Sequence, residues 1–265
     1  MRGLGHSIAK GYENPHPTEV NAGVQNTNSF EFDGNNDSLN AGDSDLFSFS
    51  SQQNGYPDSP FSVAFWINRD NTNNHALFCK ASIDNYEYRI FFVGAVLYAD
   101  SYVGDDPNNK YARRLTSSGV SSANTWEHYV VTFSGDTAGF SIYKNGVKQT
   151  TLSGGKGDDP RGDMQNLGAS FAFGECTGLI DFDGHACQLM LWNKELAEYE
   201  AQYIYGGGTV ARDPTTDSFS YNAAANLIGW WPLDDANGHE DHSSNSLDFT
   251  KVGNAGLSSS ANTPF

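Results

Sequence analysis

The sequence predicts an all-β protein with many loops, and three observations lead to this fold class. Aromatic residues make up 13% of the 265 residues, 28 residues are glycine, and only 15 are lysine or arginine. Many rings and turns with few long helix-forming side chains favour strands over helices. Runs rich in β-branched and aromatic residues recur along the chain. The third observation is Asn145-Gly146, a dipeptide typical of tight hairpins, which lies between two such runs.

Residues 126–151, WEHYVVTFSGDTAGFSIYKNGVKQTT, are predicted to form three antiparallel strands. The polar loop SGDTAG joins the first two strands. Asn145-Gly146 tolerates the positive φ angles of a type I′ turn, which places a hairpin at Phe140 to Thr151. Neither face of the first strand is wholly polar, so we expect this strand to be covered on both sides and central in its sheet.

The elements before this meander follow in order. Residues 1–27 show no periodicity and are expected to form an extended arm that becomes ordered only against a partner. Further strands are predicted at 28–34, 61–68 and 74–80, and as a pair about Val93-Gly94. Phe30 and Phe32 share one face of the first of these strands. The long polar connection 103–125 is a candidate for binding function.

The elements after the meander include one helix. The polar loop 153–166 contains Arg161-Gly162-Asp163, an adhesion motif that arises easily by chance. Strands are predicted at 170–175, 182–193, 227–238 and, more weakly, 246–250. Helical spacing of apolar residues followed by three glycines predicts a short helix with a glycine C-cap; these residues are Leu196, Tyr199, Tyr203 and Ile204. Residues 251–265 are expected to be a flexible tail.

The formal net charge of -17 disfavours binding to nucleic acid or to an anionic membrane surface, because both need a basic footprint on the protein. No apolar run is long enough for a membrane helix. The first residues, MRGLGHSIAKGYENPHP, lack the apolar core of a secretory signal, so action outside a cell would require a non-classical route. The acidity has two interpretations: it keeps the protein soluble, or clustered aspartates supply oxygen ligands to calcium.

The three cysteines, Cys79, Cys176 and Cys187, have no patterned spacing. They match neither a disulfide framework nor a zinc signature. We therefore expect all three to be reduced and buried as small apolar residues. Cys176 and Cys187 are the only pair close enough in sequence to suggest a disulfide.

Four stretches, taken in order, resemble the laminin G-like group of concanavalin A-like jelly rolls over about residues 28 to 206. They are SFEFDGNNDSLN, PFSVAFWINRD, WEHYVVTF with FSIYKNGVKQ, and FDGHACQLMLWNKELAEYEAQYIYGGG. The resemblance implies a two-sheet antiparallel jelly-roll sandwich with one short helix, ligands on the concave face or rim loops, and often a calcium ion. The core candidates are then Phe65, Trp66, Trp126, Val130, Ile142, Leu189 and Leu191.

The segment 227–245 resembles the WWPLDE start that opens many such domains, although here it comes last. We expect it to add closing strands to the same sandwich, so that the domain spans 28–250; the alternative is the stub of a second unit. Cys187 and Gln188 stand where relatives commonly carry an acidic pair. The resemblance therefore leaves a calcium site to Asp33, Asp37, Asp181 and Asp183.

Catalysis is not expected. The E-x-D-x-x-E spacing of two-sheet glucanases is missing, although glycoside hydrolysis needs two placed carboxylates. Asp84 with Glu87 lies at a loop edge, and Glu195, Glu198 and Glu200 are most simply a solvated helix face. No nucleophile motif is present. His239, Asp241 and His242 could bind a metal, but a polar turn explains them as well.

Three functions are compatible with these observations. The first is a non-catalytic virion-surface protein, a capsid decoration or a tail or fibre component, because the layout resembles phage and marine-virus structural proteins. Its arm and tail would dock neighbouring subunits in a homo-oligomer. The second is an extracellular or cell-surface glycan-binding module, with Tyr98, Tyr102, Tyr111 or Trp231 stacking on sugars. The third is an unrecognised hydrolase of β-glucans.

Overall fold

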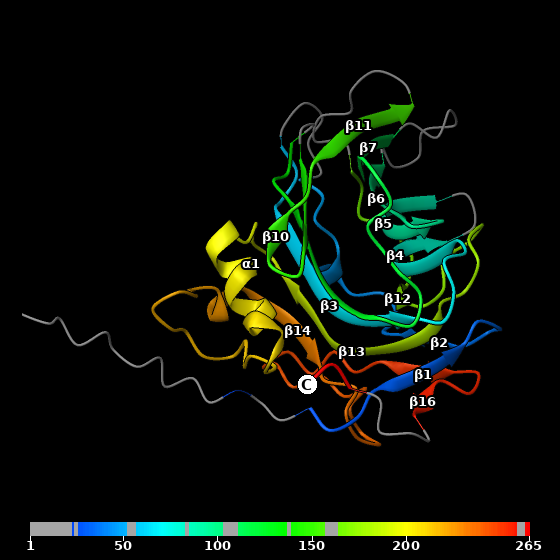
Figure 1. Ribbon diagram of the computed structural model, residues 1–265. Helices are drawn as coiled ribbons and strands as arrows, with labels where there is room; N and C mark the ends of the chain where they lie inside the picture. Colours follow the sequence, from blue (N-terminus) through cyan, green and yellow to red (C-terminus); the bar gives the residue numbers. More distant parts are fainter. Residues whose placement is uncertain are drawn as a thin grey trace, which may run out of the picture.

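Figure 1 shows a computed structural model of the protein, which describes residues 23, 26–51, 57–82, 85–102, 111–136, 139–156, 164–258 and 263–265. Two antiparallel sheets pack face to face as a sandwich, and one α-helix, α1 (Glu198–Tyr205), is found in the described residues. Short 3₁₀ turns lie at Asp45–Phe47, Gly206–Gly208 and Ala224–Asn226. The predicted sandwich with one short helix is confirmed.

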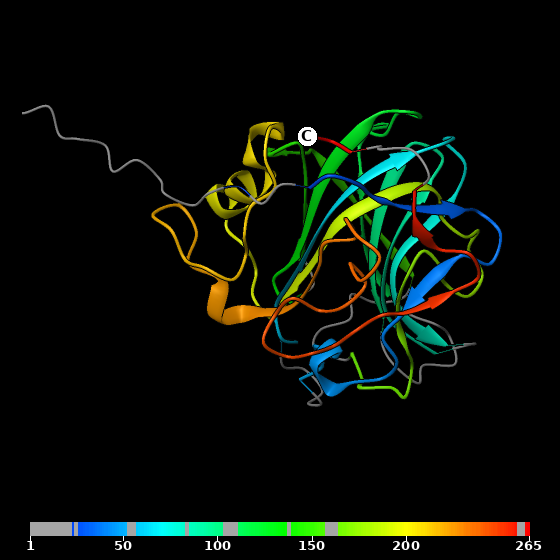
Figure 2. The same ribbon diagram turned by 90° about the horizontal axis from the view of Figure 1, so that it is seen from below.

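The first sheet contains β1 (Phe30–Asp33), β3 (Phe61–Arg69), β8 (Trp126–Phe133), β9 (Phe140–Lys144), β10 (Val147–Lys148), β13 (Asp183–Trp192), β14 (Leu227–Trp231) and β16 (Gly256–Leu257). Its strand order is β10-β9-β8-β3-β13-β1-β16, and β14 also pairs with β13. The segment 227–245 therefore contributes a strand to this sheet. In the view from below, β1 lies beside β13 (Figure 2).

The second sheet contains β2 (Ser38–Asn40), β4 (His75–Ser82), β5 (Asn85–Val93), β6 (Val96–Tyr102), β7 (Tyr111–Thr116), β11 (Thr151–Lys156), β12 (Phe171–Phe173) and β15 (Thr250–Val252). Its strand order is β11-β7-β6-β5-β4-β12-β2-β15. Three of these strands, β2, β7 and β11, were not predicted. β7 lies in the polar connection 103–125, and β11 begins where the meander was expected to end.

The meander is confirmed, and its turn has the predicted geometry. Asn145 and Gly146 have φ angles of 48° and 74°, both positive as a type I′ turn requires. β8 lies between β3 and β9, and after Trp126 each of its residues is buried. After β10 the chain leaves the first sheet, and β11 pairs with β7 in the second. This hairpin therefore connects the two layers at one edge of the sandwich.

The core fills the space between the sheets with aromatic and aliphatic side chains. Phe30 and Phe32 point into it as predicted, and Phe32 contacts Phe173 and Phe182 edge to face at 5.5 Å. Of the predicted core residues, Phe65, Trp66, Val130, Ile142, Leu189 and Leu191 are buried, whereas Trp126 is partly exposed at the margin. A second cluster lies on the other side of the first sheet, where Ala201 and Ile204 of α1 pack with Val130 and Met190.

α1 covers the outside of the first sheet and ends as the glycine cluster predicts. Gly206 has a φ of 64° and forms the left-handed C-cap. Figures 1 and 2 both place α1 and the segment 209–226 on the side of the molecule away from β4–β7. Among the described residues, no helix is both long enough and apolar enough to span a membrane.

Three expectations are corrected by the structure. Cys79 and Cys176 form a disulfide across 97 residues, so two of the cysteines are oxidised, and the suspected pair of Cys176 with Cys187 is wrong. Cys187 is free and buried. Residues 251–258, expected to belong to a flexible tail, supply parts of β15 and all of β16. Residues 1–22, 24–25 and 161–163 lie outside the described residues.

Two buried histidines make the stability of the fold sensitive to acid. Burial lowers the pKa of His128 to about 3, and burial together with Arg69 lowers the pKa of His75 to about 4. Both rings are neutral in the folded protein, but the unfolded chain binds protons below about pH 6.5. The part of the free energy of unfolding that these two neutral rings contribute is therefore complete above about pH 6.5 and is lost as the pH falls through their pKa values in the folded protein.

We expect the substitution His128→Phe to flatten this acid dependence. The phenyl ring retains the contacts with Trp66 and Tyr205, whose centroids lie 5.0 Å and 5.7 Å from that of His128. Loss of one titrating group removes up to about 1.4 kcal/mol per pH unit from the slope. Urea unfolding at pH 4.5, 5.5 and 6.5 measures this slope of the free energy of unfolding against pH. Identical slopes for the variant and the unmodified protein would contradict the assignment.

Candidate functional site

The second sheet has one face in the core and one face directed away from it, which we call the outer face. Along β5, Tyr88, Ile90 and Phe92 pack in the core, whereas the alternate residues Arg89 and Phe91 do not. Cross-strand register extends this face as one row from β12 to β7, consisting of Ala172, Cys79, Arg89, Asp100 and Arg113. The outer face lies on the opposite side of the sandwich from α1 (Figure 1).

Asp100 of β6 is the centre of this row. Its side chain is 0% exposed, and Arg89 Nε donates to its Oδ2 at 3.1 Å. Arg113 donates from Nε to Oδ1 at 2.6 Å and from Nη2 to Oδ2 at 2.7 Å, a bidentate pair. Tyr102 donates its hydroxyl to the same Oδ2 at 3.2 Å. One buried carboxylate therefore fixes two guanidinium groups side by side.

Tyrosine and phenylalanine rings surround these arginines. Tyr86 stacks on Tyr102 at 4.9 Å and Phe91 on Tyr98 at 5.2 Å, while Tyr111 contacts Tyr102 at 5.2 Å. The guanidinium carbon of Arg89 lies over Phe91, Tyr102 and Tyr86, and that of Arg113 over Tyr111, Tyr98 and Phe91, at 4.6–5.6 Å. The ring–arginine cluster consists of Tyr86, Arg89, Phe91, Tyr98, Asp100, Tyr102, Tyr111 and Arg113.

The members of this cluster differ in what they offer to a ligand. Tyr86, Tyr98 and Tyr111 are partly exposed, whereas Phe91 and Tyr102 are only 3% exposed. Burial, followed by the Asp100 carboxylate, raises the pKa of Tyr102 far above its ordinary value, so its hydroxyl stays protonated and continues to donate. Tyr102 therefore packs against the other rings as a buried residue. The three partly exposed tyrosines form the accessible aromatic surface.

A pocket of about 350 Å³ adjoins the ring–arginine cluster on the same face. Its polar lining consists of Asn40, Ser170, Glu175, Thr177 and Asp181. The disulfide between Cys79 and Cys176 forms part of its wall. Cys79 is the cross-strand neighbour of Arg89, and Ala81, which also lines the pocket, is that of Tyr86. The pocket and the rings therefore share a border and present amide, hydroxyl and carboxylate groups beside an aromatic surface.

Three of the four predicted stacking residues lie together in the structure, whereas the fourth lies in the core. Tyr98, Tyr102 and Tyr111 all belong to the cluster, although Tyr102 is buried in it. Trp231 is wrong as a stacking residue because it is 0% exposed in the core, where its ring contacts Phe249 at 4.4 Å. Its indole Nε1 donates to the carbonyl of Leu247 at 2.9 Å.

Sequence reasoning missed Tyr86, Arg89, Asp100 and Arg113. The period-two pattern of Tyr98, Asp100 and Tyr102 was visible, and it places these three side chains on one face of a strand. The missing signal was the register between strands, since Arg89 and Arg113 reach Asp100 from β5 and β7. The register of Arg113 depends on β7, and the polar sequence of this strand gave no strand signal.

The four aspartates of the predicted calcium site mainly hold turns. Asp37 accepts from the backbone N–H of Asp33, and Asp181 accepts from that of Asn36, each at 3.0 Å. Partial burial, then Asp70 and Asp33, raises the pKa of Asp183. In the part of the chain that the structure describes, no three His, Cys, Asp or Glu side chains are placed to hold a metal ion. The calcium site therefore stays a prediction that the geometry does not favour.

The second metal candidate is better described as a turn. Asp241 Oδ1 accepts from the backbone N–H of Trp230 and of Ser243, at 2.9 Å and 2.8 Å, and its Oδ2 accepts from Ser243 Oγ at 2.7 Å and from Leu247 N–H at 3.0 Å. These bonds occupy the carboxylate oxygens that a metal would need. The polar-turn interpretation of residues 239–242 is the one the contacts favour.

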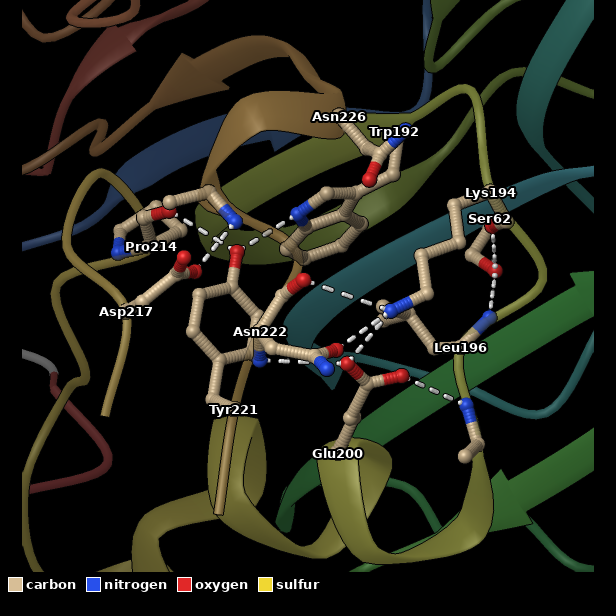
Figure 3. Close-up of polar contacts among 12 residues, drawn as sticks. Ser62, Trp192, Lys194, Leu196, Glu200, Pro214, Asp217, Tyr221, Asn222 and Asn226 are labelled. Atoms are coloured by element: carbon tan, nitrogen blue, oxygen red, sulfur yellow. Dashed lines mark hydrogen bonds and ion pairs between the residues drawn. The ribbon is translucent and has the colours of Figure 1, made fainter. Parts of the chain in front are cut away.

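The expected solvated face of α1 is wrong for Glu200, which is 0% exposed and makes the polar contacts drawn in Figure 3. Its Oε1 lies 2.7 Å from Lys194 Nζ, and its Oε2 accepts from Ala197 N–H at 2.9 Å. Nearby, Trp192 Nε1 donates to Tyr221 Oη at 2.8 Å, and Tyr221 donates to the carbonyl of Pro214 at 2.8 Å. These contacts attach α1 and the following loop to the first sheet, so they stabilise the fold and form no site.

Residues 33–202 match the family model for the concanavalin A-like lectin/glucanases superfamily. The chain belongs to this family. The match runs from the last residue of β1 to the middle of α1 and therefore includes the ring–arginine cluster. No curated protein matches the sequence.

Solved structures are similar to this lectin/glucanase-family domain at low sequence identity. A Bacteroides ovatus protein titled "putative carbohydrate binding protein" matches with a TM-score of 0.56 and 15% identity, covering 89% of this chain and 60% of that one. A heptameric SAP-like pentraxin from Limulus polyphemus has a TM-score of 0.48 and 17% identity, covering 69% and 83%. The Ruminococcus gnavus IT-sialidase CBM40, bound to α2,3-sialyllactose, has a TM-score of 0.46 and 9% identity, covering 69% and 99%.

Proposed function

We propose that this domain binds carbohydrate on the outer face of the second sheet and does not transform it. The observation that carries the proposal is the shared border between the ring–arginine cluster and the polar pocket. Sugars present an apolar face of C–H groups and an edge of hydroxyl groups, and binding sites combine rings with a few placed polar groups. Family membership supports this choice over a purely structural role.

The two parts of the face have complementary tasks. The partly exposed rings of Tyr86, Tyr98 and Tyr111 supply flat apolar area. In the adjoining pocket, Asn40 and Thr177 offer groups that both donate and accept, while Glu175 and Asp181 accept from sugar hydroxyls. Because Asp100 holds the arginines and rings in place, little side-chain freedom is lost on binding.

The contacts of Asp100 support a positioning role for this carboxylate instead of a catalytic one. A glycosidase needs a carboxylate that can exchange a proton with the substrate or attack it. Asp100, the carboxylate at the centre of the cluster, is 0% exposed and is held by two guanidinium groups and one hydroxyl. It therefore serves to position its neighbours. Release of reducing sugars from β-glucans by the purified protein would overturn this part of the proposal.

The disulfide favours an extracellular location over the interior of a cell. Bonds such as Cys79–Cys176 persist in oxidising compartments, whereas cytosolic reductants keep most thiols reduced. The virion-surface role, with docking through residues 1–27 and 251–265 and a homo-oligomeric state, stays a prediction without support from the structural neighbours or the described contacts. Carbohydrate binding is the function that the face itself favours.

We expect Tyr98→Ala and Tyr111→Ala each to weaken glycan binding about tenfold, equivalent to about 1.4 kcal/mol, because each removes a stacking ring. A glycan array identifies ligands, and titration calorimetry then gives the affinities of the variants. Phe219→Ala is the matched control, since this ring is 88% exposed and lies in the segment 209–226 beside α1. Equal affinities for all three variants would place the binding site elsewhere.

A further inference from the structure

We propose that the glycan bound at the outer face carries a carboxylate, and that Arg89 and Arg113 bind this carboxylate directly. The inference rests on the proposed function and specifies its ligand class as an acidic sugar, such as a uronic acid residue. Three observations lead to it: unused donors on both arginines, the local balance of charge, and the position of the rings beside these donors.

Both arginines retain N–H groups that no described residue uses. A guanidinium has five N–H donors. Arg89 donates to Asp100 only from Nε. Arg113 donates to Asp100 from Nε and Nη2. Within the described ranges, Nη1 of both side chains and Nη2 of Arg89 have no hydrogen-bond acceptor. The side chains are 16% and 19% exposed, so these donors lie near the surface and are already held in position.

The charge at this place differs in sign from the charge of the whole chain. Two guanidinium groups and one carboxylate give +2 − 1 = +1 within the cluster, whereas the whole chain carries -17. A guanidinium recognises a carboxylate by two parallel N–H···O bonds, which are stronger than bonds between neutral groups. An anionic ligand would therefore be attracted to this part of the surface and repelled by most of the rest.

The rings place a sugar where its carboxylate would reach these donors. Tyr98 and Tyr111 both pack against the Arg113 guanidinium, with ring centroids 5.0 Å and 4.6 Å from its central carbon. A pyranose ring stacked on either tyrosine brings a carboxylate projecting from its edge to Arg113. The pocket, lined by Glu175 and Asp181, disfavours a second negative charge at that end. The ligand thus has an acidic residue over β6 and β7 and neutral residues toward the pocket.

The test compares polysaccharides that differ only in their carboxylates. Polygalacturonate and a glucuronate-containing glycan are each titrated calorimetrically into the full chain, beside their methyl-esterified or carboxyl-reduced forms. We expect at least tenfold tighter binding of the acidic form of one pair, and a loss of this preference as salt rises from 50 to 500 mM. Equal binding of both forms in each pair would overturn the inference but leave the proposed function standing. Binding to no glycan, on these pairs or on an array, would overturn both.

Substitutions assign the preference to the two arginines. Arg89→Gln and Arg113→Gln should each reduce affinity for the acidic form about tenfold more than affinity for the esterified form, so that the preference between the two forms is lost. Arg114→Gln is the matched control, because it removes the same charge from the adjacent residue, which points to the other face of β7. Arg113→Lys keeps the charge and should restore part of the affinity. If an arginine variant does not fold, the comparison of the paired glycans with the unmodified protein still decides the inference.

Discussion

Cys176→Ser is expected to lower the free energy of unfolding by about 4 to 5 kcal/mol. The disulfide joins residues 97 positions apart, and in the chain-entropy account a crosslink that closes about 100 residues restricts the unfolded chain by roughly that amount. Both sulfur atoms belong to nearly buried residues, so the loss also disturbs the small cluster that they form with Ala76. Urea unfolding of the variant and of the unmodified protein gives the difference.

A reductant separates the disulfide from side effects of the substitution. Dithiothreitol should destabilise the unmodified protein to the level of Cys176→Ser and leave that variant unchanged. Cys187→Ala is the control for altering a cysteine, because this thiol is free, and reductant should still destabilise it by the full amount. An unmodified protein with the same unfolding midpoint with and without reductant would contradict the prediction. Because Cys176 lines the pocket, the variant should also bind glycan less tightly.

Asp100→Ala is expected to cost about 3 to 5 kcal/mol of folding free energy. Removal of one partner from a buried ionic group leaves the other charges without compensation. Here the substitution would leave Arg89 and Arg113 adjacent, with side chains only 16% and 19% exposed and no acceptor for the N–H groups that now contact Asp100. Thermal and urea unfolding at pH 7 measure the cost.

Three further variants test this prediction. Glu240→Gln removes one carboxylate from an exposed position and should change stability by less than about 0.5 kcal/mol. Asp100→Asn retains the shape but not the charge, and its cost should fall between those of the other two variants. The double variant Asp100→Ala with Arg89→Met should recover part of the loss, because one uncompensated charge is removed. A cost for Asp100→Ala as small as that of the control would show that the carboxylate does not organise the cluster.

The elements that could be predicted from the sequence are those specified by local chemistry. Asn145-Gly146 fixes its own turn by backbone conformation, and the glycines from Gly206 onward fix the end of α1 in the same way. β7 could not be found like this, since YARRLT is stabilised as a strand by pairing with β6 and β11. Cys79 and Cys176 are brought together only by the sheet, so their spacing along the chain carried no signal.

The candidate site likewise combines residues that local sequence predicts with residues that only the pairing of strands brings together. Tyr98 and Tyr111 are predicted as stacking residues because exposed tyrosines beside polar residues are typical of sugar binding. Trp231 was chosen on the same argument and is wrong, because the composition of a short stretch does not tell which side of a sheet a ring occupies. Arg89 and Arg113 could not be recognised as site residues from the sequence, because they are linked only through Asp100 on the strand between them. Cross-strand register is thus the information that a single sequence lacked.

The position of residues 26 and 263 has a consequence for how the domain can be attached to other structures. Thr263 Oγ1 donates to the carbonyl of Asn26 at 3.2 Å, and Phe265 contacts Trp66 edge to face at 5.1 Å, beside Tyr205, the last residue of α1. Both segments therefore meet on the side of the sandwich opposite the ring–arginine cluster. A surface or a fusion partner joined at either position would lie behind the first sheet, and the outer face of the second sheet would point away from it.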